Sequence, residues 1–122
     1  MKVFTGVDLI EIHRLRDINP KIRERFLQRV FTPQERVLCG ENTNSYAGRF
    51  AAKEAVAKAL GTGIGIVRWQ DIEVLKTDLG EPVLYLHNQA KIVADQKNWQ
   101  DWSLSISHTK EHAMAFFVAI AN

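Results

Sequence analysis

Three charged residues in this sequence stand where they could bind a metal ion and a phosphate group. Asp8 interrupts the apolar stretch "GVDLIEI", and Glu54 and Lys58 lie four residues apart in "GRFAAKEAVAKALGTG". Mg²⁺ is commonly held by one or two carboxylates together with phosphate oxygens and water, and a lysine ammonium is a compact charge that binds phosphate. Two acids and one cation in a half-buried cleft would therefore suit chemistry at a phosphate.

Each of these residues also has a simpler structural explanation. A lone acid in a strand, such as Asp8, is often only a hydrogen-bond acceptor. Glu54 and Lys58 have the i,i+4 spacing of a surface ion pair, which is worth about 0.3–0.5 kcal/mol. His108 follows "SLSIS" at the expected end of a strand, where it could be structural or could donate a hydrogen bond to phosphate. The pattern of residues alone leaves these alternatives open.

The helix that carries Glu54 and Lys58 is unusual in its distribution of charge. The sequence predicts this helix over residues 45–60, with Gly61 as its C-cap. At about 100° per residue its charged side chains do not gather on one side: Arg49, Lys53, Glu54 and Lys58. A helix without a polar face is usually buried within its protein or at a subunit contact, so its charges need partners.

The remaining elements must position this helix. Residues 2–12 read as a first strand, in which Gly6 indicates a bulge or the close approach of another group. Alternation places Gly6, Asp8 and Ile10 on one face of this strand, and Val7 and Leu9 on the other.

Helices are expected in the first half of the chain and strands in the second. The basic segment 13–30 is predicted to be helical with a break or restart at Pro20, and Thr32, Pro33 and Glu35 have the pattern of a capped helix start. The later elements are a hairpin turning at Leu79-Gly80, a short helix and two strands: 71–78, 82–88, 89–98, 102–108 and 112–121. This order predicts one α+β domain over residues 1–122, with helices packed on a mostly antiparallel sheet.

Composition and charge limit the possible roles. Hydrophobic residues make up 46% of the chain and charged residues 25%, which is ordinary for a globular protein. No apolar run approaches the roughly 20 residues of a membrane span, the N-terminus lacks the apolar core of a secretory signal, and Cys39 is the single cysteine. We therefore expect a cytoplasmic protein without a disulfide that does not bind membranes, and Cys39 to be buried or inert.

Positive charge is concentrated in residues 13–30, which hold six basic residues and two acidic ones in a chain of net charge +2. This segment is either a solvated face or a docking surface for an acidic partner, which could be a nucleic acid or a protein. The chain shows no pattern of base-stacking aromatic residues, and its pI of 8.8 is only mildly basic. Both features argue against a nucleic-acid-binding module.

Four segments resemble successive motifs of the bacterial holo-[acyl-carrier-protein] synthases, the small class of 4′-phosphopantetheinyl transferases. These segments are "GVDLIEIHRL", "FTPQE", "GRFAAKEAVAKALGTG" and "SISHTKEHAMAFFV", and they cover nearly the whole chain in the right order. The resemblance implies the 4′-phosphopantetheinyl transferase fold and transfer of 4′-phosphopantetheine from coenzyme A to a serine of apo acyl carrier protein. The products are holo-acyl carrier protein, for fatty acid biosynthesis, and 3′,5′-ADP.

The resemblance also implies roles for individual residues. Asp8 and Glu54 would hold Mg²⁺, or Mn²⁺ in its place, and Lys58 would meet the phosphate and assist the leaving 3′,5′-ADP. The chemistry also needs a base for the serine proton, and Glu54 acting through a metal-bound water is the candidate. Five residues would bind coenzyme A: Arg49, Lys58, Gly61, His108 and Thr109. Three would dock acyl carrier protein: Arg14, Arg23 and Arg25. Family members are trimers with a site at each subunit interface, which would explain a helix without a polar face.

Two other interpretations are weighed against this one. A subunit could have kept the fold and lost the activity, although the presence of Asp8, Glu54 and Lys58 argues against this. The larger class of these transferases has a tandem architecture, and one copy of each motif in 122 residues excludes it. A single copy must therefore build its site with a neighbour.

Overall fold

The order of elements follows the expected α+β pattern, and the computed structural model describes all 122 residues. The helices are α1 (His13–Arg16), α2 (Pro20–Val30), α3 (Pro33–Cys39), α4 (Thr43–Leu60), a short 3-10 helix η1 (Trp69–Asp71) and α5 (Asn88–Gln96). The strands are β1 (Lys2–Glu11), β2 (Ile72–Lys76), β3 (Pro82–Leu86), β4 (Trp99–His108) and β5 (His112–Ala121). None of the helices is long and apolar enough to cross a membrane.

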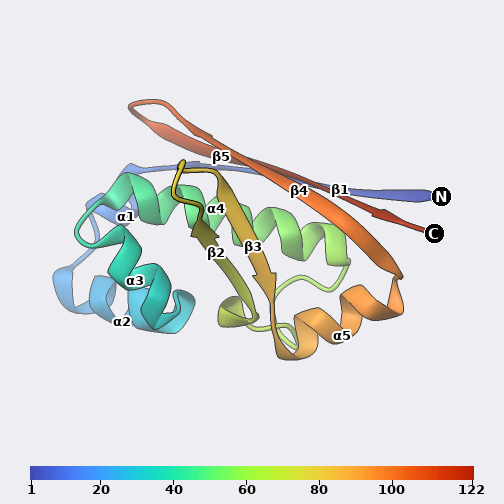
Figure 1. Ribbon diagram of the computed structural model, residues 1–122. Helices are drawn as coiled ribbons and strands as arrows, with labels where there is room; N and C mark the ends of the chain where they lie inside the picture. Colours follow the sequence, from blue (N-terminus) through green and yellow to red (C-terminus); the bar gives the residue numbers. More distant parts are fainter.

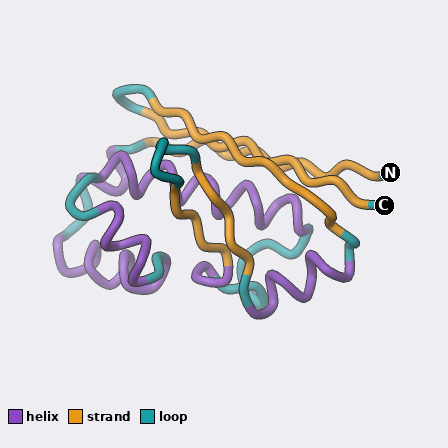
Figure 2. Tube along the Cα trace, viewed as in Figure 1, coloured by secondary structure: helices purple, strands orange, loops and turns teal.

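The strands form two antiparallel sheets instead of one. β1, β5 and β4 lie side by side in that order, and β2 pairs only with β3 as a separate hairpin. Figure 1 shows the three-stranded sheet as one layer with α4 running beneath it, while Figure 2 shows the hairpin crossing in front of α4. Because β5 lies between β1 and β4, the first and last segments of the chain meet in one sheet, and the two termini lie at the same end of the molecule.

Side-chain caps fix where the helices begin. Asn19 accepts a hydrogen bond from the backbone of Lys21 at 2.9 Å and starts α2, with Pro20 at the first helical position. The capping box predicted at Thr32 and Glu35 is present at the start of α3. α4 begins at Thr43, two residues earlier than the sequence predicted, because Asn42 caps the backbone N–H of Ser45. These caps satisfy N–H groups that the first turn of a helix cannot satisfy itself.

Gly6 lets α4 lie unusually close to the sheet. A Cβ atom at Gly6 would lie 1.8 Å from the carbonyl oxygen of Ala55, a distance that no side chain tolerates. β1 pairs with β5 without a shift in register, so Gly6 marks a close approach and not a bulge. The helix lies against the sheet through small residues, and the main core forms around them: Ala51, Ala52, Ala55, Ala59, Ala115 and Ala119 are all buried. A second cluster, around Phe31 and Tyr46, joins α1–α3 to the first half of α4.

The opposite face of the three-stranded sheet is apolar and uncovered; we call it the outer sheet face. Alternation along β5 buries Ala113, Ala115 and Phe117 against α4 and turns the intervening side chains outward. The large apolar residues of this face are 39% to 61% exposed: Val3, Val7, Leu9, Met114, Phe116 and Ile120. Contiguous apolar surface of this kind usually marks an interface.

Candidate functional site

Asp8 and Lys58 meet where α4 passes β1. Asp8 shares a face of β1 with Gly6, as predicted, and this face turns toward α4. The Lys58 ammonium donates to Asp8 Oδ1 and to the carbonyl oxygen of Val7, both at 3.0 Å. The Asp8 side chain is 16% exposed and that of Lys58 53%, so the pair opens to solvent through the lysine. Lys58 is therefore a mobile cation that is already placed at a carboxylate.

Glu54 lies one turn before Lys58 on α4 and completes this group, which we call the α4–β1 cluster. Its carboxylate forms no hydrogen bond or ion pair, so the surface ion pair between Glu54 and Lys58 is absent and Lys58 contacts Asp8 instead. Burial raises the pKa of Glu54 above its usual value, and the negative charge of Asp8 raises it further, while Lys58 opposes both. A half-buried carboxylate without a partner is costly, which is a typical feature of functional sites.

The cluster fits a divalent cation that binds together with a phosphate. It offers two carboxylates, and no group of three or more His, Cys, Asp or Glu side chains occurs anywhere in the chain. Mg²⁺ needs only one or two protein carboxylates when substrate phosphates and water supply the remaining ligands. A divalent cation would also relieve the repulsion between Asp8 and Glu54 that raises the pKa of Glu54.

Arg49 and Gly61, expected at the nucleotide, lie on α4 but outside the cluster. Arg49 faces the hairpin, where its Nε donates to the carbonyl oxygen of Val74 at 3.0 Å and its Nη1 to that of Ser45 at 3.4 Å. Gly61 ends the helix in the left-handed conformation, with φ of 79°. The chain therefore places Gly61 just beyond Lys58, and Arg49 on another side of the helix.

His108 and Thr109 lie at the far edge of the three-stranded sheet. His108 is exposed at the end of β4 and pairs with Ala113 of β5, which in turn pairs with Ile10 of β1. The Thr109 hydroxyl accepts hydrogen bonds from the backbone N–H groups of Glu111 and His112 and shapes the turn into β5. A whole strand thus separates these two residues from β1, and neither contacts the α4–β1 cluster of its own chain.

Comparison with known proteins decides the family. The sequence profile of the 4′-phosphopantetheinyl transferase superfamily matches residues 5–117. Holo-[acyl-carrier-protein] synthase of Alkaliphilus oremlandii is 48% identical over 118 residues, covering 94% of this chain and 96% of the relative. That of Caldanaerobacter subterraneus is 42% identical over 123 residues, covering 98% and 96%. The Helicobacter pylori enzyme, solved in complex with coenzyme A, has a TM-score of 0.85 and 37% identity, covering 95% of this chain and 99% of that one.

The chain belongs to the holo-[acyl-carrier-protein] synthase family. The resemblance inferred from its motifs is therefore confirmed, as is the α+β fold of this family. The comparisons do not assign roles to individual residues, so those roles remain predictions.

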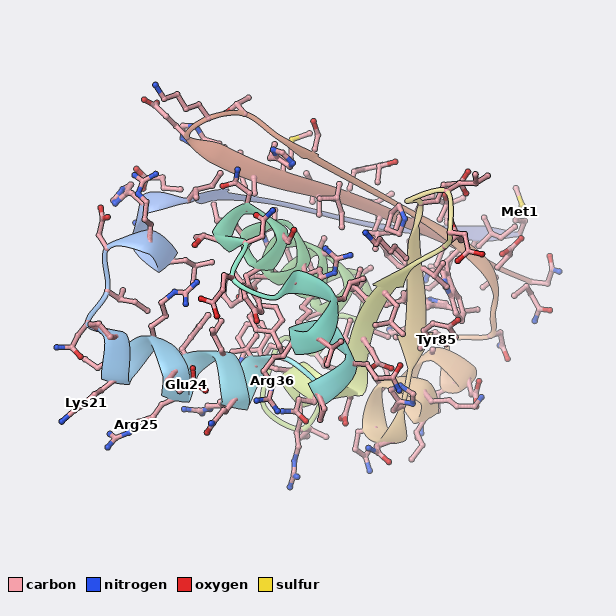
Figure 3. The ribbon with its side chains drawn as sticks, turned by 60° about the vertical axis from the view of Figure 1, so that its left-hand side comes forward. Met1, Lys21, Glu24, Arg25, Arg36 and Tyr85 are labelled. Carbon is pink, nitrogen blue, oxygen red and sulfur yellow. The ribbon has the colours of Figure 1, made fainter.

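In this member of the holo-[acyl-carrier-protein] synthase family, the three predicted docking arginines differ in their surroundings. Arg14 is exposed and lies 3.5 Å from Glu11, and Figure 3 shows Arg25 extending from α2 into solvent. Arg23 turns inward, where it donates to the Thr43 hydroxyl at 3.2 Å and lies 5.9 Å from the centre of the Tyr46 ring. Arg14 and Arg25 are free to meet a partner, whereas Arg23 also holds α2 against α4.

An apolar groove lies beside these arginines, and the charge pattern of the sequence did not reveal it. The groove has a volume of about 630 Å³ and opens between α1, α2 and β1, with Arg14 and Glu11 in its wall. Its apolar lining comes from four elements and one loop: Leu9, Ile10, Leu15, Ile18, Ile22, Phe26 and Phe50. Ile22 and Phe26 are four residues apart on α2, and this spacing is the one signal in the sequence that could have indicated an apolar stripe beside the basic residues.

Proposed function

We propose that this protein transfers the 4′-phosphopantetheine group of coenzyme A to a serine of apo acyl carrier protein, giving holo-acyl carrier protein and 3′,5′-ADP. The observation that carries the proposal is the α4–β1 cluster, which combines two carboxylates and one mobile ammonium. The curated relatives named above are holo-[acyl-carrier-protein] synthases, and the solved Helicobacter pylori relative holds coenzyme A. Their names support the same substrates for this chain.

The reaction asks the protein mainly to position groups and to neutralise charge. The serine oxygen forms a bond to the β-phosphorus of coenzyme A, and the bond from this phosphorus to the bridging oxygen breaks to release 3′,5′-ADP. Lys58 leaves Asp8 for the phosphate oxygens and stabilises the charge that develops on them and on the leaving group. Asp8 and Glu54 would hold Mg²⁺, which would supply further positive charge at the phosphate.

Glu54 is the base for the serine proton. Its carboxylate accepts no hydrogen bond from its own chain and is only partly buried, so an oxygen of Glu54 is available to receive the serine proton. The attacking serine belongs to the carrier protein, so this chain needs no activated nucleophile of its own. Its one cysteine, Cys39, is buried, and burial raises the pKa of the thiol, so Cys39 remains a protonated structural residue.

Acyl carrier protein is the proposed partner of the face formed by α1 and α2. Arg14, Arg23 and Arg25 supply positive charge for a strongly acidic partner, and the groove beside them offers an apolar surface for its side chains. Docking here brings the partner to β1, because Leu9 and Ile10 line the groove and follow directly after Asp8.

We further propose a homotrimer in which neighbouring subunits complete each site. The outer sheet face gives each copy an apolar surface to bury. His108 and Thr109 lie across β5 from Asp8 and contact neither Glu54 nor Lys58 of their own chain, which favours a neighbouring subunit as their source at each site. Arg49 and Gly61 stay proposed contacts to the nucleotide from the same chain as Lys58.

Intact-protein mass spectrometry of apo acyl carrier protein tests the proposal. The protein, coenzyme A and Mg²⁺ should add the mass of one phosphopantetheine, and EDTA should prevent the addition. Asp8→Ala or Glu54→Ala should nearly abolish transfer while the circular dichroism spectrum is kept. Asp95→Ala is the matched control, because Asp95 is an exposed carboxylate on α5 that contacts only Lys91. Absence of transfer to several carrier proteins would favour the inactive-subunit interpretation.

A further inference from the structure

Lys53, the residue before Glu54, is completely buried and fully hydrogen-bonded. Its ammonium donates to Glu35 Oε1 at 2.8 Å and to the carbonyl oxygens of Trp69 at 3.1 Å and Ile72 at 2.5 Å. The side chains of Lys53 and Glu35 are both 0% exposed. All three donors of the ammonium are used, so the position of Nζ is fixed relative to Glu35, Trp69 and Ile72.

Glu35 is held equally firmly on its side of the pair. Its Oε1 also accepts from the backbone N–H of Thr32 at 2.8 Å, and its Oε2 accepts from that of Val74 at 2.7 Å. The carboxylate therefore joins the start of α3 to β2, and Lys53 adds α4 and η1 to the same point. Two segments of the chain, α3–α4 and η1–β2, therefore meet at one ion pair.

Stability alone does not account for this arrangement. Desolvation of two charges costs several kcal/mol per ion, and well-packed apolar residues in place of a buried pair are often neutral or stabilising. A buried pair with directed hydrogen bonds fixes the rotation of α4 about its axis and its position along that axis relative to the neighbouring elements. Apolar contacts do not fix either. An apolar side chain at position 53 would tolerate small shifts of the helix.

The fixed rotation matters because the next residue is Glu54. Successive residues lie about 100° apart around a helix, so the angle that Lys53 sets toward β2 also sets the angle of Glu54 toward β1. Side-chain ends lie roughly 5–6 Å from the helix axis, and a rotation of about 20° moves them by about 2 Å. A displacement of only about 1 Å from the reacting geometry can reduce a rate about 100-fold.

The opposite side of α4 gives a second fixed point. Gly6 of β1 contacts the carbonyl oxygen of Ala55 so closely that no Cβ atom fits between them. This contact sets how near the helix lies to the sheet, but a glycine has no side chain that would resist rotation of the helix. Lys53 supplies the constraint that Gly6 does not.

We propose that Lys53, through its ion pair with Glu35, is a positioning residue for the transfer reaction, and that it acts by holding Glu54 at its place opposite Asp8. The inference rests on the proposed function. Lys53 itself contacts neither the substrate nor the metal.

Lys53→Met tests the proposal, because Met keeps an unbranched side chain of similar length and removes every hydrogen bond. We expect kcat to fall at least about 30-fold and Mn²⁺ affinity, measured by electron paramagnetic resonance with coenzyme A present, to fall at least about 10-fold. The KM for acyl carrier protein should stay within about twofold, because the docking face on α1 and α2 is not altered. A double variant, Lys53→Met with Glu35→Gln, leaves no unpaired buried charge and serves if the single variant does not fold.

Thr32→Ala is the matched control. It removes the N-cap of α3 and the hydrogen bond to Glu73 in the same region, and the backbone N–H of residue 32 still donates to Glu35. We expect this variant to melt at a lower temperature and to keep kcat and Mn²⁺ affinity within about threefold.

Two results would overturn the inference. One is a folded Lys53 variant with kcat and Mn²⁺ affinity within about threefold of the unmodified protein. The other is a parallel loss in the Thr32→Ala protein, which would mean that reduced stability alone causes the effect. Failure of the proposed function is a separate outcome, because the unmodified protein would then show no transfer at all.

Discussion

At the scale of single residues, two adjacent charges on α4 have opposite surroundings. Lys53 is fully buried and each of its donors has an acceptor, whereas Glu54 is partly buried and its carboxylate has no partner. Burial lowers the pKa of Lys53 and raises that of Glu54. The negative charge of Glu35 opposes the shift of Lys53 through a direct ion pair, whereas Lys58 opposes that of Glu54 without forming an ion pair with it. A carboxylate without a contacting partner destabilises the metal-free fold, and this cost is expected where a ligand later supplies the missing charge.

Glu54→Gln should therefore stabilise the metal-free protein at pH 7. The pKa of Glu54 lies higher in the folded state than in the unfolded state, so the folded state binds the proton more tightly. The resulting penalty is present at neutral pH and vanishes as the pH falls through the folded pKa. In EDTA at pH 7 the variant should melt at a higher temperature than the unmodified protein, and the difference should shrink as the solution is acidified.

Addition of Mg²⁺ and coenzyme A should reverse this order, because a ligand that binds only the folded state stabilises the protein that can hold it. Glu41→Gln is the control, since Glu41 is exposed and forms no hydrogen bond. A lower melting temperature for Glu54→Gln than for the unmodified protein in EDTA at pH 7 would contradict the assignment of Glu54 as a carboxylate without a contacting partner.

Lys58→Ala separates phosphate binding from metal binding. The ammonium contacts Asp8 in the free protein, so its loss removes a competitor for that carboxylate. We expect kcat to fall by about 100-fold, the usual cost of losing one group that stabilises transition-state charge. The Mg²⁺ concentration for half-maximal activity should not rise, whereas for Asp8→Asn it should. Steady-state kinetics across a Mg²⁺ titration measure both quantities, and a raised Mg²⁺ requirement in Lys58→Ala would argue against its role at the phosphate.

At the scale of elements, the site depends on how closely α4 lies against β1. Gly6→Ala should separate them, because the new Cβ would lie 1.8 Å from a backbone oxygen that cannot move without the helix. We expect the free energy of unfolding to fall by about 3 kcal/mol and kcat to fall with it, since Glu54 moves away from Asp8. Denaturant unfolding and steady-state kinetics measure the two effects.

Gly48→Ala provides the comparison, because this glycine also faces the sheet. Its Cβ would lie 2.8 Å from the Cγ2 methyl group of Ile106, a side-chain atom that can move with χ1, and alanine favours a helix by about 1 kcal/mol over glycine. The losses in the free energy of unfolding and in kcat should therefore be much smaller for Gly48→Ala than for Gly6→Ala. Equal losses in the two variants would mean that the backbone contact at Gly6 is not special.

Local signals predicted the elements well, and contacts between distant residues could not be predicted in the same way. The capping box at Thr32, the cap at Gly61 and the hairpin over 72–86 depend on neighbours in sequence, so propensity and turn chemistry were sufficient. Alternation along β1 also placed Asp8 on the correct face. The partners of Lys53 and Lys58, however, lie 18 and 50 residues away, and the helix wheel indicated only that such charges need partners. The division of the strands into two sheets likewise follows from packing on α4, which local sequence does not encode.

At the scale of the whole molecule, the outer sheet face and the position of His108 both indicate an oligomer. The face leaves large apolar side chains in solvent, and the expected nucleotide contacts of His108 and Thr109 lie across a full strand from Asp8. A monomer would leave these apolar side chains in solvent and would keep His108 and Thr109 away from the nucleotide. We expect assembly through this face to bury these side chains and to bring His108 and Thr109 of one copy to Asp8 of the next.

Phe116→Glu should therefore produce a monomer that lacks activity. Phe116 is 46% exposed, lies opposite Val7 in the sheet and stands near the middle of the outer sheet face. A carboxylate there would have to be desolvated without a partner on assembly, which the buried interface cannot compensate. Light scattering should give 13.9 kDa for the variant and about three times this mass for the unmodified protein. Val37→Glu, at an 85% exposed apolar residue of α3, should keep both mass and activity. An unmodified protein that is monomeric and active would exclude the shared site, and His108 would then act from within its own chain or not at all.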